Sequence, residues 1–100
     1  MNEPVYVGVV RLELHLPEAR SLKEKRASVR PLVERIRNRH QVMMVESDHR
    51  DLHQRAGFAI AARSTDRVDV EARLQRVRTT VDGTWPGYVL AWDLEVLQLD

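Results

Sequence analysis

Two histidines four residues apart, His49 and His53, are the side chains in this sequence best spaced to hold a metal ion. In a helix, residues at this spacing share one face, and the aspartates of the same segment, 48–55, could complete a site. The segment lacks the glutamate of a zinc-protease motif, and the chain has no cysteine. We therefore predict no metal and no cofactor, and interpret the segment as an aspartate-capped turn whose Leu52 enters the core.

Other residues that could support catalysis are poorly placed for it. None of the four histidines has a serine or cysteine nucleophile in a recognisable setting. Asp93 and Glu95 lie on one face of a predicted strand, where two carboxylates could act as an acid and a base, but an exposed strand leaves both solvated. We predict that the protein is not an enzyme.

The segment from Arg20 to His40 is strongly basic. It contains eight lysines and arginines against two glutamates, a net charge of +6, whereas the whole chain carries +1. Cations in the first turn of a helix oppose the helix dipole, which makes the run 21–26, Ser-Leu-Lys-Glu-Lys-Arg, unusual. This asymmetry indicates an anionic partner, although a pI near 8.3 is below that of most dedicated nucleic-acid binders.

Part of this charge falls along one side of the predicted helix. At about 100° per residue, four cations lie within roughly 60° of one another, namely Lys23, Arg26, Arg30 and Arg37. Their spacing suits a phosphate backbone; the alternative is a solvated face whose long side chains shield the edge of the core. With two cations added from the segment 48–55, the predicted RNA- or anion-binding set is Lys23, Arg26, Arg30, Arg37, Arg50 and Arg55.

Six elements are predicted to position these side chains. Apolar residues alternate as in strands or recur at helical spacing, and Ser21 with Glu24 forms the cap of the first helix. The predicted strands are 5–16, 41–47, 56–63 and 88–99, and the predicted helices are 21–39 and from 64–66 to 83. This order predicts one ferredoxin-like α+β domain over residues 1–100, a βαββαβ sandwich of a four-stranded antiparallel sheet with two helices on one face.

The open face of this sheet is predicted to be apolar. Even-numbered residues of the first strand face the helices, which puts Tyr6 and Phe58 in the core and leaves no aromatic residue outside to stack bases. Small apolar side chains instead suit the close packing of two sheets in a twofold dimer. We therefore predict a homodimer through the open sheet face, made of Val5, Val7, Val9, Ala59, Ala61, Val89 and Ala91.

The composition is that of a globular protein. Hydrophobic residues make up 43% of the chain and charged residues 31%. No apolar run approaches the roughly 20 residues that a membrane span needs, and Arg11, Glu13 and His15 interrupt what would be the apolar part of a signal peptide. We expect a cytoplasmic protein without a membrane partner.

Two segments of the chain resemble a known family. The segment 7–26, with its Ser-Leu-Lys-Glu-Lys-Arg run, and the segment 48–56, which ends Asp-Leu-His-Gln-Arg-Ala, are similar to those of the YlxP-like family of small bacterial proteins, also called the domain-of-unknown-function-503 family. The resemblance implies a ferredoxin-like fold but no established activity and no catalytic residues. Members are commonly encoded near genes for translation initiation and ribosome maturation, which implies a ribosomal or RNA partner. Pro31, within the first helix, departs from the family pattern.

Two hypotheses for the function remain open at this point. The first is a module that binds ribosomal RNA or a ribosomal subunit through the basic helix. The second is a homodimeric protein-interaction or small-anion-binding regulatory module that does not bind nucleic acid. Salt-sensitive retention of RNA favours the first hypothesis, and tight dimers without RNA favour the second.

Overall fold

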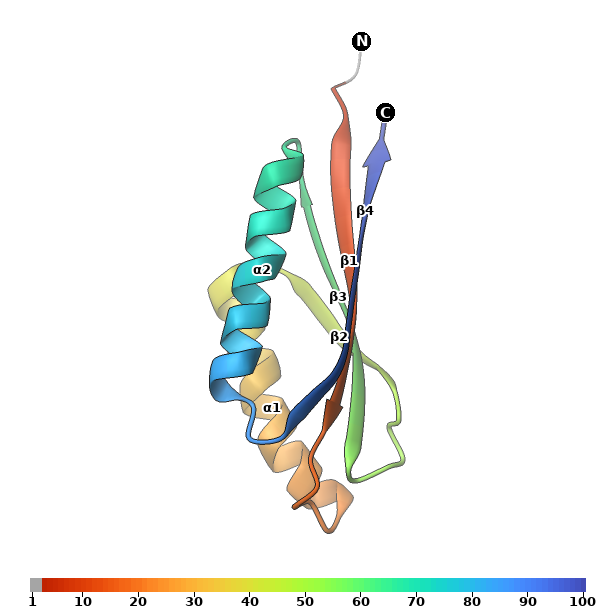
Figure 1. Cartoon of the computed structure of the whole chain (residues 1–100), viewed down its shortest axis with the longest axis vertical. Coiled ribbons are helices and arrows are strands. Elements are labelled where there is room, and N and C mark those ends of the chain that lie inside the picture. The colour runs from red at the N-terminus through yellow and green to blue at the C-terminus, as the bar shows by residue number, and fades with distance from the viewer. Residues whose placement is uncertain (1–2) are drawn as a thin grey trace.

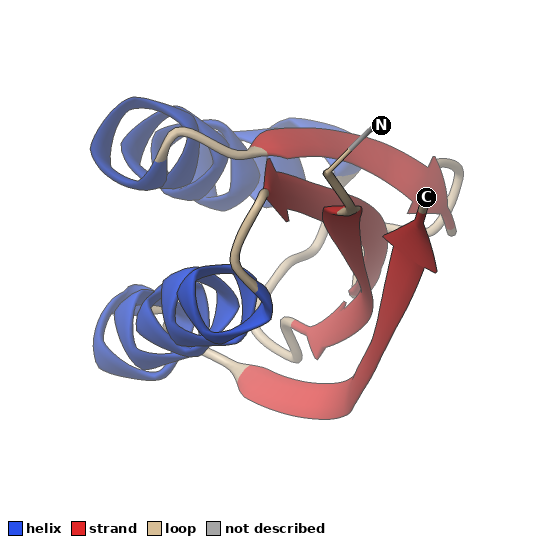
Figure 2. Cartoon of the chain, turned by 90° about the horizontal axis from the view of Figure 1, so that it is seen from above, coloured by secondary structure: helices blue, strands red, loops and turns tan. Residues whose placement is uncertain are grey.

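The computed structural model describes residues 3–100, which form four strands and two helices in the predicted order. These are β1 (Val5–His15), α1 (Leu22–His40), β2 (Met43–Asp48), β3 (Arg55–Ser64), α2 (Arg67–Thr84) and β4 (Tyr88–Leu99). The strands make one antiparallel sheet in the order β2-β3-β1-β4. Both helices cover the same face of that sheet (Figures 1 and 2). The structure therefore confirms the predicted ferredoxin-like α+β fold.

The molecule is elongated because β1 and β4 are long. Its principal extents are 54 × 22 × 19 Å, and these two long neighbouring strands run along the longest axis (Figure 1). Within residues 3–100, neither helix is both long enough and apolar enough to cross a bilayer. Within the part of the chain that the structure describes, no helix or strand covers the other face of the sheet (Figure 2), so that face is open to solvent.

The core lies between the sheet and the two helices, as the alternation in β1 predicts. Val10, Leu12 and Leu14 are fully buried and face the helices, and Phe58 on β3 is only 1% exposed. Tyr6 packs against the edge of the same core. The helices contribute the apolar stripes Val29, Leu32 and Ile36, and Val70, Leu74, Val77 and Val81.

Gly8 allows α2 to lie close against β1. A Cβ atom at this position would stand 2.5 Å from Cγ1 of Val70 and 2.6 Å from Cδ1 of Leu74. Both distances are far inside van der Waals contact, so a larger residue would force the side chains of Val70 and Leu74, or the helix that carries them, to move. The absence of a side chain at Gly8 thus sets the spacing between α2 and β1.

A bulge in β4 reverses the expected orientation of one predicted dimer residue. Glu13 pairs with Ala91, but its neighbour Leu14 pairs with Val89, so Leu90 is an extra residue in β4. Such an insertion shifts the alternation of the strand by one position. Val89 therefore packs against the core, and its prediction as part of the open face is wrong.

Helix α1 is a single helix, as predicted, despite Pro31 near its middle. Its N-cap is Ser21, whose hydroxyl accepts a hydrogen bond from the backbone N–H of Glu24 at 3.1 Å. Pro31 is exposed, so the carbonyl that loses its helical donor there can bond to water. The left-handed conformation of Gln41, with φ of 53°, ends the helix and turns the chain into β2.

Helix α2 begins and ends close to the predicted positions. Asp66 is its N-cap and accepts a hydrogen bond from the N–H of Val68 at 3.0 Å. Gly83 was predicted to terminate the helix but lies inside its last turn. Trp85 is the C-cap, and its indole N–H donates to the carbonyl of His15 at 3.2 Å. This buried tryptophan fixes the start of β4 against the end of β1.

Candidate functional site

The outer surface of α1 carries three cations that form the candidate site. Lys23, Arg26 and Arg30 are exposed and, with Ala27 and Pro31, line a shallow depression of about 430 Å³. Among residues 3–100, none of the three side chains forms an ion pair or a hydrogen bond. We call these three residues the α1 patch. Their charge is directed to solvent and is not neutralised by the protein itself.

The two helices differ in how their charges are compensated. Helix α2 pairs three arginines with acids one turn away along the helix, and these ion pairs are Arg67–Glu71 at 2.9 Å, Arg73–Asp69 at 3.2 Å and Arg78–Asp82 at 3.0 Å. In α1, Glu24 instead caps the helix, because its carboxylate accepts a hydrogen bond from the N–H of Arg20 at 3.1 Å. The same carboxylate occupies the helix N-terminus, which would otherwise attract an anion. An external anion would therefore contact the side of α1 rather than its end.

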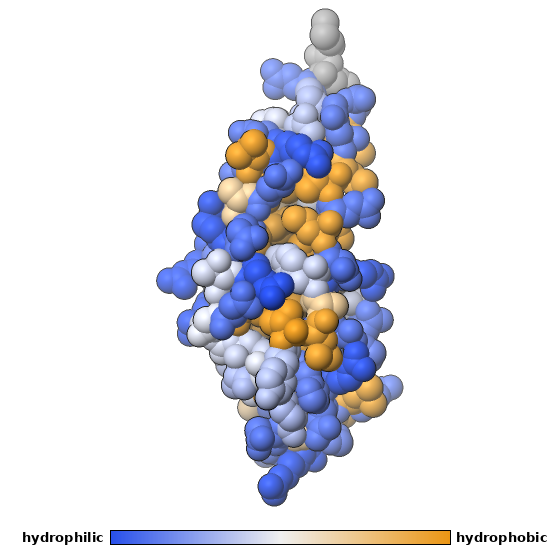
Figure 3. Space-filling view, in the orientation of Figure 1, coloured by the Kyte–Doolittle hydropathy of each residue, from blue (hydrophilic) through white to orange (hydrophobic). Residues whose placement is uncertain are grey.

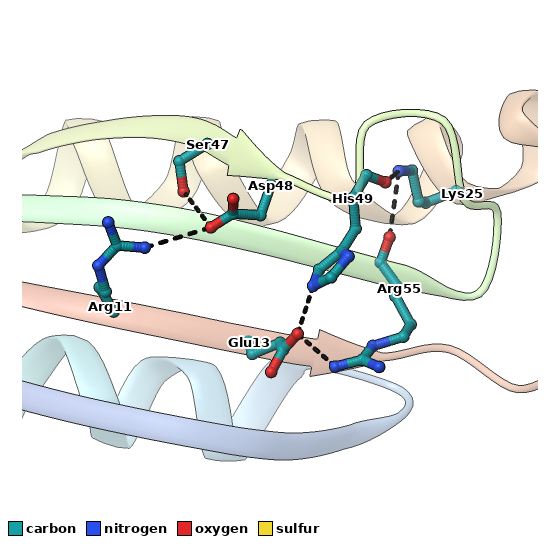
Figure 4. Close-up of polar contacts among 7 residues, drawn as sticks. All are labelled: Arg11, Glu13, Lys25, Ser47, Asp48, His49 and Arg55. Atoms are coloured by element: carbon teal, nitrogen blue, oxygen red, sulfur yellow. Dashed lines mark hydrogen bonds and ion pairs between the residues drawn. The ribbon is translucent and has the colours of Figure 1, made fainter.

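Lys25 belongs to the same basic run but has a structural role. Its side chain is only 3% exposed, and Nζ lies 3.2 Å from Oε2 of Glu46. Nζ also donates to the carbonyl oxygens of His49 at 3.0 Å and of Arg55 at 3.2 Å (Figure 4). The ammonium group thus holds the β2–β3 connection against the first turns of α1. Nothing in the sequence distinguishes this lysine from its neighbours except its position on the buried side of the helix.

Arg37, predicted to extend the α1 patch, is held by β2. Its Nε donates to the carbonyl oxygen of Met44 at 3.1 Å. β2 is an edge strand, so this carbonyl has no partner strand on its outer side, and the guanidinium satisfies it. We therefore leave Arg37 out of the α1 patch, although its angular position on the helix is as predicted.

The two predicted cations of the β2–β3 connection separate in the structure. The guanidinium of Arg55 contacts the carboxylate of Glu13 on the open face of the sheet, on the opposite side from α1 (Figure 4). Arg50 is exposed, and its carbonyl oxygen lies 3.5 Å from Nζ of Lys25. Lys25, on the buried side of α1, therefore holds the backbone of Arg50 near the first turns of the helix, whereas the guanidinium of Arg55 lies on the open face.

The histidines of this connection do not form a metal site in the described structure. His49 has φ of 60°, which turns the chain out of β2, and its imidazole contacts Glu13 instead of His53 (Figure 4). No group of three potential metal ligands occurs among residues 3–100. Leu52 is 49% exposed, so the expectation that it enters the core is wrong. The connection is held by polar contacts rather than by an apolar anchor.

The open face of the sheet is divided into an apolar half and a charged half. Five predicted residues lie in the apolar half, and the pairing of β2 and β4 adds four exposed apolar side chains that the sequence analysis did not assign to it. We call this set the open-face patch, and its members are Val5, Val7, Val9, Met43, Val45, Ala59, Ala61, Leu97 and Leu99. The predicted Ala91 pairs with Glu13 and so lies in the charged half.

Ion pairs occupy the charged half. Arg11 contacts Asp48 at 3.3 Å, and Glu13 contacts both His49 and Arg55 (Figure 4). A small pocket of about 140 Å³ lies between these groups. Its lining includes Arg11, Glu13, Asp48, Gly57, Ala91 and Asp93. Arg11, Glu13, Asp48, His49 and Arg55 are thus paired with one another, unlike the cations of the α1 patch, whereas Asp93 forms no ion pair within residues 3–100.

The comparisons with known proteins identify the family. Residues 7–93 match the family described as "Protein of unknown function (DUF503)". The chain belongs to the DUF503 family. One DUF503 relative, "Uncharacterized protein YlxP" of Bacillus subtilis (strain 168), is 40% identical over 76 residues, which cover 76% of this chain and 83% of that protein. The family resemblance seen in the sequence is thereby confirmed.

A comparison with solved structures supports the same fold. The "De novo designed protein Foldit4" superposes with a TM-score of 0.58, covering 96% of this chain and 97% of that one. The sequence identity is 16%, so the likeness concerns the fold alone. For this DUF503 protein, the function must be argued from its surface.

Proposed function

We propose that this protein is a non-enzymatic, cytoplasmic module that binds ribosomal RNA or a ribosomal subunit through the α1 patch, assisted by Arg50. The observation that carries the proposal is the uncompensated charge of Lys23, Arg26 and Arg30. The second helix pairs three of its four arginines with acids. Arg35, Arg39 and Arg76 also form no ion pair within residues 3–100, so the α1 patch differs from them in that its three cations lie together around one depression. An anionic partner would supply the missing counter-charges.

The dimensions of the patch suit a phosphate backbone better than a single small anion. Arg30 lies seven positions after Lys23, a rise of about 10 Å along the helix. A nucleic-acid strand presents several phosphates over that length. Contacts of this kind position a protein on RNA without reading its sequence, so we expect little sequence preference.

The proposed binding has a calculable dependence on salt. With about three phosphate contacts, the logarithm of the affinity should fall with the logarithm of the salt concentration with a slope of about −2.1 to −2.7. Between about 50 and 200 mM salt the affinity should therefore fall roughly 20- to 40-fold. Binding that depends on stacking or on an apolar surface would respond far less.

Cosedimentation with ribosomal subunits at low salt tests the proposal. The double substitution Lys23→Glu with Arg30→Glu should abolish cosedimentation, because it turns most of the α1 patch negative. The control is Arg35→Glu with Arg39→Glu, which makes the same change of charge on exposed residues about 150° round the same helix. Equal cosedimentation of both double variants and the wild type would refute the proposal. Equal loss of cosedimentation in both variants would mean that binding depends on net charge and not on the α1 patch.

A further inference from the structure

The open-face patch is a second surface that the proposed function does not use. Four of its side chains are strongly exposed, at 69% for Met43, 52% for Val45, 46% for Leu97 and 55% for Leu99. All four lie on strands, in register with the smaller residues of β1 and β3. Soluble monomers seldom expose a contiguous apolar area of this kind, so the patch indicates an interface.

The size of the face can be compared with that of a protein interface. The four strands have 11, 6, 10 and 12 residues, and at about 3.3 Å per residue and about 4.8 Å between strands they present a face on the order of 600 Å², of which the open-face patch is roughly half. Each partner in an interface of standard size buries about 800 Å². A second copy of this sheet would cover the whole face, including its charged half, and so approach that area, whereas a short peptide would cover only a fraction of it.

Two unpaired charges flank the patch on opposite sides of β1. Arg63 on β3 pairs with Val7, and Glu95 on β4 pairs with Val9. Both side chains are exposed, and neither forms an ion pair within residues 3–100. The apolar strip along β1 is thus flanked by a positive group on one side and a negative group on the other.

We propose that this face packs against the same face of a second copy of the chain, about a twofold axis that runs parallel to β1 between the two sheets. Such an axis places the β3 side of one sheet over the β4 side of the other. Arg63 of each copy then approaches Glu95 of the second copy, and two ion pairs form at the rim. An axis across the strands would instead place both charges over apolar residues.

The arrangement leaves both helices on the outside of the dimer. Each α1 patch remains exposed, because the helices cover the opposite face of the sheet (Figure 2). The dimer is therefore independent of the proposed RNA binding, and either could hold without the other.

The free edge of β4 is the main competing surface. Apolar side chains gather there beside α2 (Figure 3), and Leu94 and Val96 line a groove of about 540 Å³ with residues of that helix. If β4 paired with β4 of a second copy about Leu94, however, Asp93 would lie opposite Glu95. Like charges directly opposite each other destabilise antiparallel pairs. On the open face, the proposed axis places Arg11 and Glu13 opposite their own copies, but each is already paired within its own chain, Arg11 with Asp48 and Glu13 with His49 and Arg55.

Two matched valine substitutions test which surface forms the dimer. Val7→Asp places a charge in the open-face patch, and the control Val68→Asp places one on an exposed valine at the start of α2, 70% exposed. We expect analytical ultracentrifugation to find a wild-type dimer, a dimer for Val68→Asp and a monomer for Val7→Asp. A wild type that is monomeric up to millimolar concentration would overturn the proposal, as would a Val7→Asp dimer as tight as the wild type.

Charge exchange tests the axis and does not depend on a substitution in the patch itself. Arg63→Glu and Glu95→Arg should each weaken the dimer about tenfold, because each turns two attractions into repulsions. The double variant Arg63→Glu with Glu95→Arg should restore the wild-type dissociation constant. A double variant as weak as the single variants would contradict the proposed twofold arrangement, even if the protein dimerises.

Discussion

Replacing Lys25 with methionine should destabilise the fold far more than the same substitution at Lys23 or Arg26, the other two cations of the run 21–26. Methionine keeps the apolar stem but removes the ammonium group, which Glu46 and the carbonyl oxygens of His49 and Arg55 now surround. At 3% exposure the ammonium position is inaccessible to bulk water, so water cannot replace it for these acceptors.

The expected loss of stability follows from those contacts. A hydrogen bond to a charged group contributes about 1.5–3 kcal/mol, and breaking a buried ion pair costs about 3–5 kcal/mol. The side chain of Glu46 is 27% exposed and keeps part of its hydration, which places the result near the lower end, at about 3 kcal/mol. With a urea m-value of about 1–1.5 kcal/mol/M, the unfolding midpoint should fall by about 2–3 M.

Urea unfolding of Lys25→Met and Lys23→Met measures this difference. Lys23 is two residues away, is exposed and has no partner within residues 3–100, so its substitution should change stability by less than about 0.5 kcal/mol. Hydrogen exchange at the backbone amide of Leu16 should also be faster in the Lys25 variant. The N–H of Leu16 donates to the carbonyl oxygen of Gln54 at 2.9 Å, and Gln54 belongs to the β2–β3 connection that Lys25 holds in place. If both variants unfold at the same midpoint, the structural role assigned to Lys25 is wrong.

Three further predictions concern the fold. Gly8→Ala should destabilise the protein by about 1–3 kcal/mol in urea unfolding, because its Cβ would displace α2; an unchanged midpoint would mean that α2 packs less closely. Trp85→Phe should cost about 1 kcal/mol through loss of the indole bond to His15, and a neutral result would show that this bond contributes nothing. Burial, followed by the charges of Arg39 and Arg76, lowers the pKa of His40 below 6.5. The neutral imidazole therefore contributes to stability above pH 6.5, and this contribution is lost as the pH falls through the lowered pKa. Unfolding midpoints between about pH 7 and 5 should therefore fall less for His40→Gln than for the wild type, and parallel curves would contradict this.

The order of elements could be predicted because local patterns determine it. The alternation in β1 correctly separated Val10 and Leu12 from Val7 and Val9, and the cap at Ser21 placed the start of α1 within one residue. The bulge at Leu90 could not be predicted in this way. An extra residue in an edge strand leaves the apolar pattern intact, and only the pairing with β1 reveals it.

The roles of individual cations depended on tertiary contacts. Angular position on α1 correctly grouped Lys23, Arg26 and Arg30, but it could not show that Arg37 bonds to a carbonyl of β2. The burial of Lys25 likewise depends on a connection more than 20 residues away in the sequence. Helical periodicity describes the surface of one element, whereas these contacts depend on how that element meets the sheet.

The most direct test of the central claim is the salt dependence of RNA binding by the wild-type protein. The dissociation constant for a ribosomal RNA fragment should be measured between about 50 and 200 mM salt. If the α1 patch contacts phosphates, the affinity should fall roughly 20- to 40-fold over that range. Affinity that changes less than about twofold, or no binding at the lowest salt, would contradict the assignment of α1 as an RNA-binding surface.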